Sequence, residues 1–220
     1  MNSLQHKNKI VMKSDNIAPF FTKKVKNADF NKNSALQNLI EGNKRYLTGK
    51  SIHPNQTAEY RIDIAKDPHP FAIILSCSDS RVPPEIIFDQ GIGDLFVVRN
   101  AGNILNNEVL GSIEYAVEFF GVKLIVVMGH SSCGAVSAAV QGGEFGGHIN
   151  FLVDAIQPAV EKAKFKNGDV VENSVNENII SVVEKLKFSE PILMHLVQRG
   201  DLNIIGAYYE MISGNVNLGM

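Results

Sequence analysis

Short apolar runs alternate with amphipathic stretches along this chain from residue 71 onward. The runs at 71–76, 95–98, 123–128 and 192–197 are continuously apolar, which is typical of strands in a sheet covered on both faces. Between them, apolar positions recur at helical spacing and predict helices near 84–88, 106–120, 131–141, 148–166 and 172–187. This strand–helix–strand repetition predicts an α/β fold with a central, mostly parallel β-sheet, flanking helices and right-handed crossovers.

The two ends of the chain have different patterns. Residues 1–28 are polar and Lys-rich and are predicted to form an N-terminal arm, which leaves residues 29–220 as a single domain. Ser34 and Gln37 have capping-box spacing, so a helix is predicted to begin near Ser34. Residues 51–70 are polar and proline-containing and predict a loop with a short helix. Residues 204–216 predict an added C-terminal edge strand, with a turn at Gly214 and Asn215.

Composition and charge narrow the possible partners. A chain of 220 residues with 45% hydrophobic residues suits one globular domain with a sizeable core. The formal net charge of −2 gives no general electrostatic reason to expect a nucleic acid or an anionic membrane as a partner. The sequence contains no apolar run of the ~18 residues that span a bilayer, and its start lacks the apolar segment of a secretory signal. We therefore expect a cytoplasmic protein whose thiols stay reduced.

The only two cysteines each follow a predicted strand. Cys77 is followed by Asp79 and Arg81, and Cys133 is preceded by His130. Open α/β sheets bind ligands at the carboxyl ends of their strands, so the two motifs are expected to converge there. Residues two apart share a side of an extended chain, and residues three apart are neighbours in a first helical turn, which would bring His130 next to Cys133. Two thiolates and an imidazole are a zinc ligand set, and a catalytic zinc site leaves the fourth position open.

Asp79 governs that fourth position. A carboxylate two residues from a ligating cysteine can reach the metal itself, whereas bidentate pairing with the guanidinium of Arg81 would hold it away. The hypothesis is a switch in which Asp79 either orients a bound hydroxide or closes the site. Two thiolates leave the ion nearly neutral, so its water should be less acidic than the pKa of about 7 found with three histidines. Activity should therefore rise with pH above neutrality.

Four motifs in order, at residues 77–83, 97–103, 113–117 and 129–134, resemble those of the β-class carbonic anhydrases. The resemblance covers roughly residues 35–140. It implies reversible hydration of carbon dioxide to bicarbonate and a proton by a zinc-bound hydroxide, with one zinc ion per chain. It also implies a homodimer, often paired into a homotetramer, with the active site at the subunit interface.

The resemblance also assigns roles to individual residues of this chain, according to the positions they occupy in the family's motifs. They match the zinc ligands (Cys77, His130 and Cys133), the catalytic carboxylate–arginine dyad (Asp79 and Arg81) and the lining of the apolar substrate pocket (Phe96 and Tyr115). The sequence also departs from the family in two places. Pro68 stands where many members carry a glutamine that can hydrogen-bond the substrate. Ile74 stands where members with an allosteric bicarbonate site carry a tryptophan, so the open, water-bound state is favoured.

Several alternatives stay open. The same scaffold could hydrolyse carbon disulfide or carbonyl sulfide, or could serve as a non-catalytic zinc or bicarbonate sensor with Asp79 permanently on the metal. The two cysteines could be structural thiols or a disulfide, and the Asp79–Arg81 pair a structural salt bridge. Phe96 and Tyr115 could belong to the core. A dithiol redox protein is disfavoured because the chain has no Cys-x-x-Cys motif.

Overall fold

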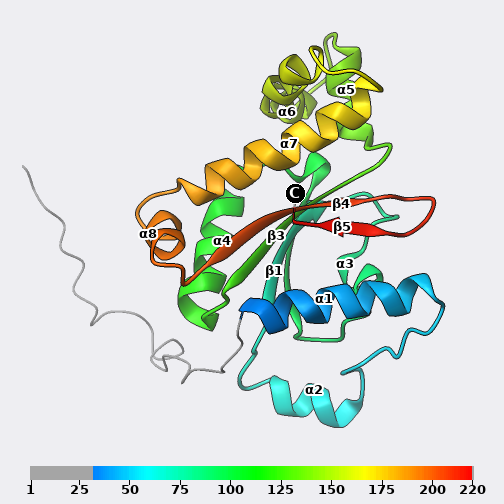
Figure 1. Cartoon of the computed structure of the whole chain (residues 1–220). Coiled ribbons are helices and arrows are strands. Elements are labelled where there is room, and N and C mark those ends of the chain that lie inside the picture. The colour runs from blue at the N-terminus through cyan, green and yellow to red at the C-terminus, as the bar shows by residue number, and fades with distance from the viewer. Residues whose placement is uncertain (1–31, 220) are drawn as a thin grey trace, which may run out of the picture.

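The computed structural model describes residues 32–219, so the arm predicted at residues 1–28 lies outside the described residues. One five-stranded sheet has the strand order β2-β1-β3-β4-β5 (Figure 1). Its strands are β1 (Ala72–Cys77), β2 (Leu95–Asn100), β3 (Leu124–His130), β4 (Asn203–Tyr209) and β5 (Val216–Leu218). The first four run parallel, and β5 pairs antiparallel with β4. The predicted α/β fold, with a mostly parallel sheet and an added C-terminal edge strand, is confirmed.

Helices surround the sheet on both faces. They are α1 (Lys32–Leu47), α2 (Ala58–Ile64), α3 (Pro84–Ile87), the short 3₁₀-helix η3 (Ala101–Asn103), α4 (Asn107–Phe120), α5 (Gly134–Gln141), α6 (Ile149–Ala163), α7 (Val170–Lys187) and α8 (Leu193–Gln198). Helix α7 packs across β3 and β4, and α1 lies on the other side of the sheet (Figure 1). The approach of α7 is close, since a Cβ atom on Gly129 would lie 2.8 Å from the side chain of Ile179.

The central strands explain the continuous apolar runs. Every residue of β1 and β3 is buried, because strands on both sides and helices on both faces exclude water from them. Strand β2 lies at the edge and is only partly buried. Since β1 ends at Cys77 and β3 ends at His130, the two best-covered strands deliver these side chains to one edge of the sheet.

The run at 192–197 was predicted to be a strand, and that prediction is wrong. It forms α8, in which Leu193 is buried while Leu196 and Val197 pack against the core at helical spacing. A short apolar run does not distinguish a strand from a buried helix by periodicity alone. The fourth parallel strand is β4, which lies inside the sheet, and the predicted tail strand is in fact a β4–β5 hairpin whose turn contains Gly214 at φ 78°.

The first helix is present where it was predicted. Helix α1 spans Lys32–Leu47 and so includes Ser34 in its first turn, and the side chain of Gln37 donates to Glu41 Oε1 at 3.0 Å, one turn further on. The short helix expected within 51–70 is α2, which Thr57 caps by accepting a hydrogen bond from the Tyr60 amide at 3.1 Å.

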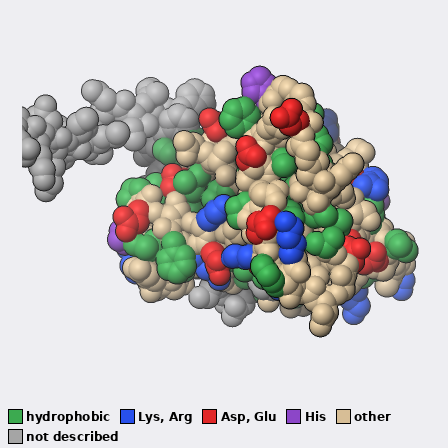
Figure 2. All heavy atoms as spheres, turned by 90° about the horizontal axis from the view of Figure 1, so that it is seen from above, with side chains coloured by type: hydrophobic (Ala, Val, Ile, Leu, Met, Phe, Trp, Pro, Cys, Tyr) green, Lys and Arg blue, Asp and Glu red, His purple; other side chains and the backbone are tan. Residues whose placement is uncertain are grey.

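The surface shows no separation of charge on the face drawn in Figure 2, where acidic and basic side chains are interspersed. This agrees with the small net charge of the chain. Within residues 32–219, none of the helices combines the length and apolarity that a membrane crossing requires.

Candidate active site and metal centre

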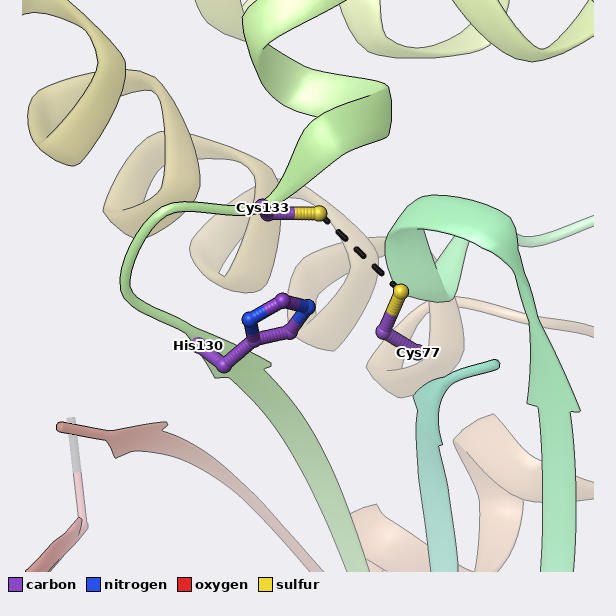
Figure 3. A group of neighbouring side chains, drawn as sticks. All are labelled: Cys77, His130 and Cys133. Carbon is purple, nitrogen blue, oxygen red and sulfur yellow. Dashed lines mark hydrogen bonds between the residues drawn. The ribbon is translucent and has the colours of Figure 1, made fainter. Parts of the chain in front are cut away.

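Three potential metal ligands meet at the carboxyl ends of the central strands. Cys77 is the last residue of β1, His130 is the last residue of β3, and Cys133 immediately precedes α5. Their ligand atoms all lie within 4.8 Å of one another, and all three residues are buried. Figure 3 shows the imidazole edge turned toward the two sulfur atoms. The structure thus brings together the three residues that the sequence predicted as ligands.

The route by which His130 meets Cys133 differs from the prediction, which placed both residues in one helical turn. His130 belongs to β3, and α5 starts only at Gly134. A two-residue turn connects them, and within it Ser132 has a φ of 54°. This left-handed conformation reverses the chain and returns Cys133 to the end of the strand. The expected juxtaposition is therefore present, but a tight turn produces it instead of helical periodicity.

The geometry fits a tetrahedral metal ion. The sulfur atoms of Cys77 and Cys133 are 4.0 Å apart, close to the ~3.8 Å expected for two sulfurs each about 2.3 Å from a tetrahedral zinc. That separation is about twice the ~2.05 Å of a disulfide bond, so both are free thiols. Nδ1 of His130 lies 2.9 Å from the carbonyl oxygen of Ser131. Nε2 is buried and has no hydrogen-bond partner among the described residues, which leaves its lone pair available to a metal.

The two thiols shift each other's pKa in opposite directions. A hydrogen bond from Cys133 lowers the pKa of Cys77, and the amide of Gly102, 3.3 Å from the Cys77 sulfur, lowers it further. The same interaction raises the pKa of Cys133. Burial lowers the pKa of His130, but the adjacent Cys77 thiolate outweighs that effect and raises it overall. A metal ion that binds here would displace the remaining protons, because it coordinates the deprotonated forms.

Asp79 and Arg81 form a bidentate pair at the rim of this cluster. Arg81 Nε donates to Asp79 Oδ1 at 2.9 Å, and Nη2 donates to Oδ2 at 2.8 Å. The Arg81 amide also donates to Oδ1 at 2.9 Å. These hydrogen bonds, led by those from the guanidinium, hold the pKa of Asp79 well below its usual range. Asp79 lies outside the group of mutually close ligand atoms in the described chain. The arrangement is therefore the one in which Arg81 holds the carboxylate.

Two further residues support the site and were not predicted from the sequence. Arg99 donates from Nε to the carbonyl of Cys77 at 3.0 Å and from Nη2 to the carbonyl of Asp79 at 2.7 Å. Gly102 donates its amide to the Cys77 sulfur and accepts a hydrogen bond from Asn178 at 2.9 Å. Both belong to the motif at 97–103, which is the sequence feature that could have identified them as part of the site. Their contacts became evident only in the folded chain.

Phe96 and Tyr115 lie elsewhere in the same chain. Phe96 is on β2, where Asn100, four residues later, pairs with Cys77, so Phe96 is about 13 Å further back along the strand. Tyr115 is on α4, and its ring centroid is 6.5 Å from that of Phe96. Both rings also contact Phe120, with centroids 6.0 and 5.4 Å away. The two residues thus form part of a half-buried aromatic cluster, and their role in a substrate pocket stays a prediction.

Comparisons with known proteins agree with this geometry. A sequence model of the carbonic anhydrase family matches residues 72–216. Carbonic anhydrase 2 of Mycobacterium tuberculosis is 39% identical over 189 residues, which are 84% of this chain and 91% of that protein. The carbonic anhydrase of Mycolicibacterium smegmatis is 36% identical, over 84% of this chain and 92% of its own length.

Solved structures are similar over most of the fold. The β-carbonic anhydrase CcaA covers 83% of this chain and 94% of its own, with a TM-score of 0.66 and 29% identity. One of two tetrameric β-carbonic anhydrases from Sordaria macrospora covers 84% of this chain and 96% of its own, with a TM-score of 0.67 and 25% identity. Together with the cluster of two thiols and an imidazole at the sheet edge, these similarities show that the chain belongs to the β-carbonic anhydrase family.

Proposed function

We propose that this carbonic anhydrase hydrates carbon dioxide with one zinc ion per chain, held by Cys77, His130 and Cys133. The reaction, reversible conversion of carbon dioxide to bicarbonate and a proton, is that of the family to which the chain belongs. The observation that carries the assignment of the ligands is the buried Nε2 of His130. It has no hydrogen-bond partner in the described chain and belongs to the same compact group as the two sulfur atoms.

Zinc, when bound, makes water a nucleophile near neutral pH. The protein's contribution is to fix the ligands. The Ser131 carbonyl accepts a hydrogen bond from Nδ1 of His130, which selects the tautomer whose Nε2 lone pair faces the sulfurs. The thiolates of Cys77 and Cys133 offset the positive charge of the ion, which supports the expectation that activity rises with pH above neutrality.

Asp79 is proposed to orient the attacking water. Because Arg81 engages both carboxylate oxygens, Asp79 stays ionised and is kept from binding the metal. The carboxylate can still accept a hydrogen bond from the water, since each oxygen has more than one lone pair. Arg99, on β2, donates hydrogen bonds to the backbone carbonyls of Cys77 and Asp79. These bonds hold the ligand Cys77 at a fixed distance from Asp79, which is proposed to orient the water.

The substrate pocket is proposed to form between subunits. Carbon dioxide is uncharged and a poor hydrogen-bonding partner, so an apolar lining suits it. Phe96 and Tyr115 lie too far along the sheet to reach the cluster of their own chain, but β2 is a partly exposed edge strand. A homodimer, or a homotetramer built from it, would let these rings line the site of a second copy.

The protein is also proposed to be cytoplasmic. Its two cysteines are free thiols, and the cytoplasm keeps thiols in the reduced form that can bind a metal.

The alternative functions are less well supported. Hydrolysis of carbon disulfide or carbonyl sulfide would use the same cluster, but the relatives that match over most of their length are named carbonic anhydrases. A non-catalytic sensor would keep Asp79 on the metal, whereas Arg81 engages both of its carboxylate oxygens here.

The direct test is zinc content measured together with stopped-flow hydration of carbon dioxide at pH 7 and pH 9. We expect one zinc per chain, measurable hydration and a higher rate at pH 9. His130→Gln should lose both zinc and activity. Zinc without hydration at either pH would favour a sensor, and turnover of carbon disulfide in its place would favour the hydrolase. A wild-type protein that binds no zinc would overturn the proposal.

A further inference from the structure

The turn between His130 and Cys133 needs external support. Only two residues connect these two proposed ligands, and Ser132 adopts the left-handed conformation at φ 54°. This region is uncommon for a residue with a side chain. A small rotation of this turn would change the positions of the imidazole and the sulfur together. The contacts that hold the turn are therefore expected to influence how the site receives a metal.

Helix α7 and the end of β4 supply those contacts. The amide of Ser132 donates to Glu172 Oε1 at 3.1 Å, and the hydroxyl of Tyr208 donates to Glu172 Oε2 in a short hydrogen bond. One carboxylate thus joins the turn to a strand that lies beside β3. Backbone contacts add to this, since Ser131 donates its amide to the carbonyl of Tyr209 at 3.0 Å.

The position of Glu172 favours this role. It is the third residue of α7, and its amide donates to the helix-capping carboxylate of Asp169 at 2.9 Å. A glutamate three residues after the cap commonly reaches back to the cap amide. Here its two oxygens bond Ser132 and Tyr208 instead. Hydrogen bonds to a carboxylate are stronger than those between neutral groups, so Glu172 is a suitable acceptor for both donors. Burial and the adjacent carboxylate both raise the pKa of Tyr208, so its hydroxyl keeps the proton that it donates.

The pair contacts the turn from a pocket that adjoins the site at Arg81. Glu172, Tyr208, Ser131, Ser132 and Arg81 line a hollow of about 700 Å³. Within the described part of the chain, this lining does not include Cys77, His130 or Cys133. The carboxylate of Glu172 bonds the Ser132 amide and the Tyr208 hydroxyl, so the pair acts on the backbone between the two ligands.

We propose that Glu172 and Tyr208 are positioning residues that set the geometry of His130 and Cys133 and thereby the zinc affinity of the site. This inference rests on the proposed function, because it takes the cluster to be a zinc site. Groups that orient metal ligands typically change metal affinity by about 10–100-fold when they are removed. The loss should therefore be seen in zinc binding itself, without any measurement of catalysis.

The test compares zinc dissociation constants, measured by chelator competition on folded protein, for wild type and four variants. Glu172→Ala removes both hydrogen bonds and should weaken binding about 10–100-fold. Tyr208→Phe and Glu172→Gln each leave part of the network and should show smaller losses of zinc affinity. The glutamine of Glu172→Gln can still accept one hydrogen bond, so this variant should bind zinc more tightly than Glu172→Ala. Tyr209→Phe is the matched control, because its hydroxyl contacts that of Tyr46 at 3.4 Å and not the turn. It should bind zinc as tightly as wild type.

A spectroscopic readout separates positioning from general destabilisation. The visible spectrum of the cobalt(II)-substituted protein reports ligand geometry and should change in Glu172→Ala and Tyr208→Phe but not in Tyr209→Phe. If Glu172→Ala does not fold, Tyr208→Phe and Glu172→Gln carry the test. Variants that lose thermal stability yet keep wild-type zinc affinity and cobalt spectra would overturn the inference while leaving the proposed function intact. Wild-type protein that takes up no zinc would overturn the proposed function and this inference together.

Discussion

Replacing Gly102 with alanine should perturb the metal site through backbone and packing together. Gly102 has a φ of 76° and donates its amide to the sulfur of Cys77. A Cβ atom there would lie 2.7 Å from Cδ1 of Ile156 and 3.2 Å from Cβ of Ala135. The end of the Ile156 side chain can rotate away, but Ala135 lies on α5, two residues after Cys133, so relief of its contact would shift α5 relative to Cys77.

The expected loss of stability has two parts. A left-handed conformation costs a residue with a side chain about 1–2 kcal/mol. Overpacking in a close-packed interior adds about 1–3 kcal/mol. The free energy of unfolding of Gly102→Ala should therefore fall by roughly 2–5 kcal/mol. Gly121→Ala is the matched control, because Gly121 has a φ of 66° and no described atom lies within 4 Å of the place that an added Cβ would take. It should lose only the backbone part, about 1–2 kcal/mol.

Urea unfolding at a fixed protein concentration measures both free energies, and the difference between the two variants isolates the packing contribution. Chelator competition then measures zinc affinity. Gly102→Ala should bind zinc about tenfold or more weakly, because it displaces a hydrogen bond to a ligating sulfur. Gly121→Ala should bind zinc normally. Equal destabilisation of the two variants, with zinc affinity unchanged in both, would refute the reasoning.

Three further outcomes are expected for the dyad and the pH response. Asp79→Asn should keep its zinc but lower kcat/KM by about 10²–10⁴-fold in stopped-flow hydration, the range for loss of a positioned proton-accepting group; wild-type activity would exclude that role. Arg81→Ala should also reduce hydration because the carboxylate is released, whereas Arg199→Ala, which removes an exposed pair with Asp201 at 3.0 Å, should not; equal rates in both would count against the dyad. Because the pKa of Asp79 lies below its ordinary value of about 3.9, the carboxylate is ionised throughout pH 6.5–9, so the rise of the wild-type rate over this interval comes from the metal site; a flat profile would contradict this.

Local patterns sufficed to predict much of this protein. The apolar runs of β1 and β3 and the helical spacing of α4 depend on neighbours within a few residues, so they are readable without the fold. The juxtaposition of Cys77 with His130 and Cys133 was predictable for a related reason. Parallel strands place their carboxyl ends at one edge of the sheet, so two motifs that follow neighbouring strands lie close together, and β1 and β3 are neighbours.

Packing decided what those patterns left ambiguous. The run at 192–197 is apolar enough for a strand, but it packs as α8, and β4 takes the sheet position beside β3. The turn between His130 and Cys133 depends on a single backbone angle, the left-handed φ of Ser132. The hydrogen bonds from Gly102 to Cys77 and from Ser132 to Glu172 join residues that are distant in sequence. Neither hydrophobic periodicity nor motif spacing encodes such contacts, because they form only when helices and strands pack against one another and close the remaining space.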